Sequence, residues 1–168
     1  SVTASPTTTT TYSVLGTSSV NNCSATDTVT IYVNPLPILD AIPNSSTICA
    51  GDSIEITVNG AQDFTWSPTL GLNPPSGSLV TANPMTTTYY IITGTDINDC
   101  KDSTSAIVIV NPQPILTLSS VPNTHDICEG ASLDINAFGA VSYSWSPSVG
   151  LNTTLGSSVS ASPSTSTY

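Results

Sequence analysis

Few residues of this chain could do chemistry, and their types limit what that chemistry could be. His125 is the only imidazole and Lys101 is the only basic side chain, since the chain has no arginine. A single histidine cannot supply a nucleophile, a general base and an orienting group together. We therefore expect no catalytic residue, no cofactor-binding residue and no cofactor, and we do not expect the chain to be an enzyme.

One acidic turn is a weak candidate for a metal site. The stretch TDINDCKD gathers Asp96, Asp99 and Asp102, and oxygen ligands clustered in a loop are what Ca²⁺ prefers. The corresponding stretch upstream, SSVNNCSATD, lacks most of these carboxylates. A solvated acidic turn is therefore the competing interpretation.

The composition excludes several classes of partner. The 168 residues carry a net charge of −10, only 7% are charged, and the pI is about 4.1. Such a surface repels phosphate backbones and anionic lipid headgroups, so we expect no nucleic acid partner. No apolar run approaches the roughly 18 residues of a membrane helix, so we expect no membrane insertion.

The elements that must position these residues come from an internal repeat. NNCSATDTVTIYVNPLPIL (21–39) matches NDCKDSTSAIVIVNPQPIL (98–116) at an offset of 77, and FTWSPTLGLN (64–73) matches YSWSPSVGLN (143–152) at an offset of 79. Ordered blocks at one period indicate copies of one module. SLVTANPMTTTYY (78–90) is likewise echoed at both ends of the chain.

The repeat predicts the domain organisation. We expect residues 1–35 to be the C-terminal part of one module, 36–112 a complete module and 113–168 the N-terminal part of a third. The phrases NPLPIL and NPQPIL mark the seams, where proline fixes φ and removes N–H donors. With almost no linker between the expected strands, we expect a stiff string of modules and a segment of a longer array.

The expected fold class is all-β, as tandem immunoglobulin-like Greek-key β-sandwiches. Short alternating or β-branched runs separated by turn residues predict strands in the complete module; these runs are 53–58, 63–68, 78–82, 86–95 and 104–110. Trp66 and Trp145 are the expected core of the third strand. Tyr12 and Tyr89, with Tyr90 as the alternative to Tyr89, are the expected core of the penultimate strand.

The order ICAGDS, FTWSP, LGLN, ANPMTTTYYIITGTD, Cys and IVIVNP resembles the PKD-like and immunoglobulin-like tandem repeats of Bacteroidota surface proteins. That group includes adhesins and other cargo of type 9 secretion. The resemblance implies an extracellular or cell-surface location. It also implies O-glycosylation at Asp-Ser/Thr tripeptides, with Thr28, Ser53 and Ser103 as candidates, although Asp and Ser are also common at turns. WSPTLGLN replaces the acidic, glycine-rich stretch usual in PKD-type domains, which argues against inherited calcium binding.

The secreted context that the resemblance implies favours disulfides, and the four cysteines allow several pairings; they are Cys23, Cys49, Cys100 and Cys128. In an immunoglobulin-like sandwich, Cys49 and Cys100 lie at opposite ends, about 20 Å apart, against the roughly 4.4–6.8 Å that a disulfide needs. Bridges to neighbouring modules, an in-module Cys49–Cys100 bridge and free thiols all stay open.

The expected function is that of a structural repeat segment of a long surface adhesin or filament, acting as a stiff spacer or shaft. Its expected partners are neighbouring repeats of the same chain, identical chains in a filament, and surface glycans or cells at a tip outside this segment. The alternatives are a glycan- or protein-binding immunoglobulin-like module and accessory repeats of a secreted hydrolase.

Overall fold

A computed structural model describes residues 2–123 and 126–166, and all regular structure in these ranges is β-strand. The chain forms two compact units, Ser1–Asn111 and Pro112–Tyr168. The described residues include no helix that is long and apolar enough to cross a bilayer.

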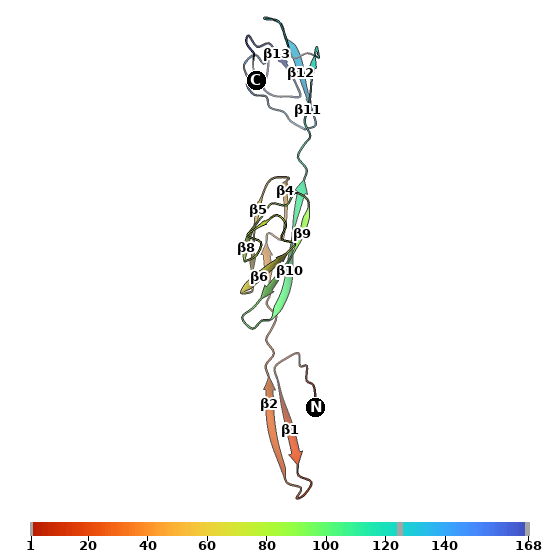
Figure 1. Ribbon diagram of the computed structural model, residues 1–168, viewed down its shortest axis with the longest axis vertical. Coiled ribbons are helices and arrows are strands. Elements are labelled where there is room, and N and C mark those ends of the chain that lie inside the picture. Colours follow the sequence, from red (N-terminus) through yellow and green to blue (C-terminus); the bar gives the residue numbers. More distant parts are fainter. Residues whose placement is uncertain (1, 124–125, 167–168) are drawn as a thin grey trace. The chain divides into compact units, whose positions relative to one another are not determined.

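A complete β-sandwich lies within the first unit (Figure 1). One sheet has the order β3-β5-β8-β7, formed by β3 (Asp40–Ile42), β5 (Ile54–Asn59), β8 (Leu79–Ala82) and β7 (Leu72–Asn73). The other has the order β4-β10-β9-β6, formed by β4 (Ser45–Cys49), β10 (Lys101–Asn111), β9 (Thr88–Thr95) and β6 (Asp63–Ser67). This pairing is that of an immunoglobulin-like sandwich, so the expected fold class is confirmed.

The first strand of the sandwich is divided between the two sheets at Pro43. Before it, β3 pairs antiparallel with β5, and after it β4 pairs parallel with β10. Proline suits this change because it has no N–H to donate to either ladder. The five strands expected from the sequence are present, with bounds shifted by up to three residues, whereas β4 and the short β7 were not foreseen.

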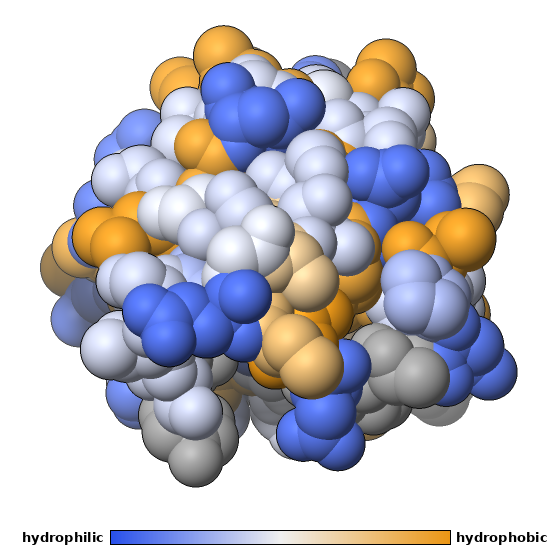
Figure 2. Space-filling view, turned by 90° about the horizontal axis from the view of Figure 1, so that it is seen from above, coloured by the Kyte–Doolittle hydropathy of each residue, from blue (hydrophilic) through white to orange (hydrophobic). Residues whose placement is uncertain are grey.

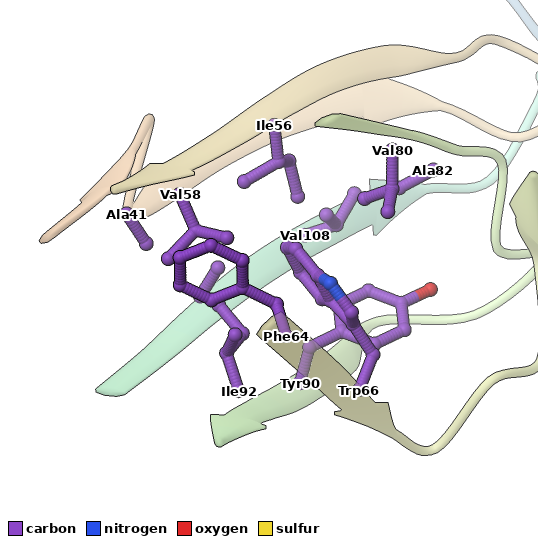
Figure 3. Close-up of a cluster of buried hydrophobic side chains, with 11 residues drawn as sticks. Ala41, Ile56, Val58, Phe64, Trp66, Val80, Ala82, Tyr90, Ile92 and Val108 are labelled. Atoms are coloured by element: carbon purple, nitrogen blue, oxygen red, sulfur yellow. The ribbon is translucent and has the colours of Figure 1, made fainter. Parts of the chain in front are cut away.

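The core fills the space between the two sheets (Figure 3). Trp66 lies edge-on to Tyr90, with ring centroids 6.2 Å apart and an interplanar angle of 73°. The polar atoms of both rings are satisfied, because Trp66 Nε1 donates to the Gly77 carbonyl (2.9 Å) and the Tyr90 hydroxyl donates to the Leu70 carbonyl (3.0 Å). Buried aromatic side chains with such partners add packing area without leaving an unsatisfied donor.

Tyr90, and not Tyr89, is the core tyrosine of the penultimate strand. Tyr90 is 0% exposed and Tyr89 is 56% exposed. Successive side chains of a strand point to opposite faces, and Tyr90 shares its face with Ile92, which is also fully buried. The prediction that Tyr89 belongs to the core is therefore wrong.

The flanking segments repeat parts of this sandwich. An antiparallel hairpin is formed by β1 (Thr10–Thr17) and β2 (Ser24–Ile31), and its Tyr12 is 38% exposed. A three-stranded sheet in the second unit is formed by β11 (Thr117–Val121), β12 (Leu133–Phe138) and β13 (Ser158–Ala161). Trp145 is only half-buried there, so neither Tyr12 nor Trp145 lies in a closed core.

The seams lie outside the ladders. Residues 32–39 separate β2 from β3, and residues 112–116 separate β10 from β11. These connections are longer than the near-absent linker expected from the sequence, because the prolines at 35, 37, 112 and 114 remove N–H donors along them.

The exposed surface is weakly polar rather than charged. Figure 2 shows pale residues of intermediate hydropathy interspersed with hydrophilic and apolar residues. This agrees with a composition in which only 7% of residues are charged.

Gly60 lies in the turn between β5 and β6, where the seam before β3 packs closely against it. Its φ is +105°, and a Cβ there would overlap the Ile38 carbonyl, whereas Gly77 has φ +104° with nothing within 4 Å. We expect Gly77→Ala to lower the unfolding free energy by about 1–3 kcal/mol through backbone strain. Gly60→Ala should lower the unfolding free energy by roughly 2 kcal/mol more than Gly77→Ala does, because its methyl group also overlaps the Ile38 carbonyl. Equal losses in chemical denaturation would show that the contact with Ile38 is unimportant.

Candidate functional site

The two residues best suited to general acid–base chemistry are Lys101 and His125. Lys101 is the exposed first residue of β10. His125 lies outside the described residues.

The acidic turn uses its carboxylates for its own backbone. Asp96 Oδ1 accepts hydrogen bonds from the backbone N–H groups of Asn98 (2.8 Å) and Cys100 (2.9 Å), and Asp102 Oδ1 accepts one from Ser103 (2.8 Å). Asp99 holds the left-handed position of the turn at φ 61°. Among the described residues, no three His, Cys, Asp or Glu side chains gather as metal ligands would. The structure therefore does not bring Asp96, Asp99 and Asp102 together as a set of calcium ligands.

The cysteines lie at opposite ends of the sandwich. Cys49 pairs with Asn111 at the end of β10, and Cys100 directly precedes Lys101 at its start. A strand of 11 residues spans about 33 Å at roughly 3.3 Å per residue, several times the separation of bridged Cα atoms. The structure therefore excludes the in-module Cys49–Cys100 bridge, one of the three alternatives left open by the sequence. All four thiols, including those of Cys23 and Cys128, are free in the structure.

The three candidate sugar acceptors are all accessible. Thr28, Ser53 and Ser103 are exposed. The backbone N–H of Thr28 donates to Asp27 Oδ1 (2.8 Å), as that of Ser103 does to Asp102, so these aspartates also order the local backbone. O-glycosylation at these positions stays a prediction.

Two concavities differ in character. The first is a shallow hollow of about 630 Å³ beside Cys49 and Asn111, where Asn83 Nδ2 ties down the carbonyls of Gly51 (3.0 Å) and Asp52 (2.8 Å). No aromatic platform lines it. The second is an open concavity of about 1070 Å³ in the second unit, and its lining is of mixed polarity; it includes Leu133, Ile135, Trp145 and Leu151 together with Asp126 and Glu129.

Tyr90 is the titratable group that the core perturbs. Burial raises the pKa of the Tyr90 hydroxyl above its ordinary value of about 10, and a hydrogen bond with Thr88 opposes this. The folded state therefore binds the phenolic proton more tightly than the unfolded state. The stabilisation is complete below about pH 10 and is lost as the pH rises further.

Comparison with known proteins adds little to this description. No protein-family model and no curated protein matches the chain. Among solved structures, the ectodomain of human desmocollin-1 aligns at 10% identity and a TM-score of 0.31, over 86% of this chain and 34% of that one. The chain thus spans about a third of that ectodomain, and its fold class rests on its own strand pairing.

Tyr90→Phe should separate two effects of the phenol on the unfolding free energy: its hydrogen bond and its ionisation at high pH. At pH 7 we expect the variant to lose about 1 kcal/mol of unfolding free energy with the bond to the Leu70 carbonyl. Above about pH 10 the variant should lose less stability than the wild type, because it has no buried phenol to ionise. Denaturant melts at several pH values measure both, and the exposed neighbour variant Tyr89→Phe should match the wild type at pH 7. Parallel alkaline losses in Tyr90→Phe and wild type would contradict this account.

The separation of the thiols predicts the result of peptide mapping. Digestion of the 168-residue chain without reduction should yield no peptide linking Cys49 to Cys100, because β10 holds them apart. Detecting that link as a major species would mean that β4 does not pair with β10 as described.

Proposed function

We propose that this chain is a structural repeat segment of a long extracellular adhesin or filament, and that its modules act as a stiff spacer. The observation that carries the proposal is that the residues recurring between copies build the module itself. Trp66 and Trp145 each donate Nε1 to a glycine carbonyl, Gly77 and Gly156 respectively.

The recurring glycines serve the same purpose. Gly60 and Gly139 both have strongly positive φ, and each leaves room for the carbonyl of a residue in the seam before the next strand, Ile38 or Ile115. Gly71 and Gly150 share a φ of 76°. Glycines that recur where the backbone must approach closely indicate a structural role for the repeated residues rather than a ligand-binding one.

The two seams favour a stiff connection between modules. Pro35, Pro37, Pro112 and Pro114 lie in the two connections between ladders. Proline restricts both itself and the preceding residue to extended conformations, so such a connection is a semi-rigid spacer. A surface of hydroxyl-bearing residues with few charges, and a single lysine as a site for trypsin, suits a location outside the cell.

Lengthening the array tests the spacer role. Inserting a second copy of residues 36–112 after Pro112 should add about 35–45 Å to the maximum dimension in small-angle scattering, if the strands lie near the long axis. Under the same conditions, Pro112→Gly with Pro114→Gly should broaden the distance distribution without changing the melting of the sandwich.

Pro75→Gly, in an exposed loop of the sandwich, is the matched control and should leave the distribution unchanged. A particle that does not lengthen on insertion, or seam variants indistinguishable from the wild type, would count against a stiff spacer.

A further inference from the structure

One asparagine of the sandwich is placed to react with its own backbone. Asn59 is the last residue of β5, and it is the only asparagine in the chain that is followed by glycine. The backbone nitrogen of the next residue can attack an asparagine carboxamide, and Gly60 favours this attack because it has no Cβ to obstruct it. Both residues are exposed, and no hydrogen bond within the described ranges holds the Asn59 carboxamide.

The Gly60 N–H lies outside both ladders of β5. The Val58 N–H donates to the Ser78 carbonyl on the β8 side (2.7 Å), and Asn59 pairs with Asp40 on the β3 side. Because successive N–H groups of a strand point to opposite edges, that of Gly60 points to the β8 side, where the β5–β8 ladder has already ended. The nitrogen that would attack is therefore not held by a hydrogen bond among the described residues.

The structure restrains other asparagines at this same nitrogen. Four asparagines precede proline, which has no N–H to lose in such an attack; they are Asn34, Asn73, Asn83 and Asn111. The Asp99 N–H, which follows Asn98, donates to the Asp96 carbonyl (3.2 Å). The N–H groups that follow Asn22 and Asn136 are also engaged in hydrogen bonds. Asn59 thus combines a glycine neighbour with a free backbone nitrogen.

We propose that Asn59 is a modification site, at which the folded chain converts its own carboxamide to a carboxylate. The Gly60 nitrogen bonds to Asn59 Cγ, the Cγ–Nδ2 bond breaks, and Nδ2 leaves as ammonia with the proton of the Gly60 nitrogen. Water then opens the cyclic imide at either carbonyl. One product is aspartate, and the other is isoaspartate, in which the main chain runs through the former side chain. Water is the co-reactant, and nothing is oxidised or reduced.

The position of Asn59 gives the reaction a structural effect. Its cross-strand partner in β3 is Asp40, which is also exposed. A carboxylate at position 59 lies opposite that of Asp40, and like charges directly opposite destabilise a strand pair. Isoaspartate adds a main-chain carbon just before Gly60, where the Ile38 carbonyl leaves no room even for a Cβ. Either product therefore weakens the attachment of β3, and of the seam before it, to the sandwich.

The inference is independent of the spacer role, because it concerns one site in one module. The counterpart of Asn59 in the second unit is Phe138, which has no carboxamide. The site is therefore not among the residues that recur between copies, and a failure of either proposal leaves the other standing.

Mass spectrometry of the aged protein tests the reaction. The folded chain is incubated at mildly alkaline pH and then mapped by peptides. Conversion at Asn59 should be at least about 10-fold faster than at Asn98, because the Asp99 nitrogen must first lose a hydrogen bond. Conversion at Asn59 that is no faster than at Asn98, or that occurs only in denaturant, would overturn the proposal.

Asn59→Gln is the matched control for the chemistry. Glutamine keeps an exposed carboxamide but places it one carbon further from the backbone, so the same ring cannot form. The variant should fold as the wild type does and should show no conversion at position 59. Conversion of the glutamine at the rate of the wild-type asparagine would contradict attack by the Gly60 nitrogen.

Asn59→Asp tests the effect on β3 without any ageing. Hydrogen exchange at low salt should show the Asp40 and Ile42 amides of β3 exchanging roughly 2–5-fold faster than in the wild type, because two carboxylates then face each other. Adding Asp40→Asn removes the repulsion and should restore the wild-type rate. Unchanged exchange in Asn59→Asp, or no recovery in the double variant, would overturn the proposed weakening of β3.

Discussion

The structure depends on one constraint, that a sheet with an apolar face must be covered by a second sheet. In residues 36–111 the β9–β10 hairpin provides this cover, and Tyr90, Ile92 and Val108 are fully buried beneath β5 and β8 (Figure 3). At about 25 cal/mol per Å² of apolar area, this burial is the dominant favourable term in a module of this size. The same hairpin also supplies the ladder partners of β4 and β6.

The polar groups of the module are committed to this construction. Asp96 and Asp102 accept backbone N–H groups, Trp66 and Tyr90 donate to loop carbonyls, and Asn83 ties down a turn. Groups that elsewhere bind ions or substrates here satisfy backbone atoms. The indole donor is the part of this construction that recurs between copies, since Trp145 Nε1 donates to the Gly156 carbonyl as Trp66 Nε1 donates to that of Gly77.

The sequence by itself determined the module length, the seams, five of the strands and the all-β class, because alternation, turn residues and a repeated phrase are local features. It could not identify β4, an edge strand that exists only through pairing with β10. It left Tyr89 and Tyr90 open, since both lie in one β-branched and aromatic run and only the facing sheet decides which side is inward. The tertiary structure alone separated Cys49 from Cys100, because that separation follows from the pairing of β4 with β10, two strands far apart in the chain.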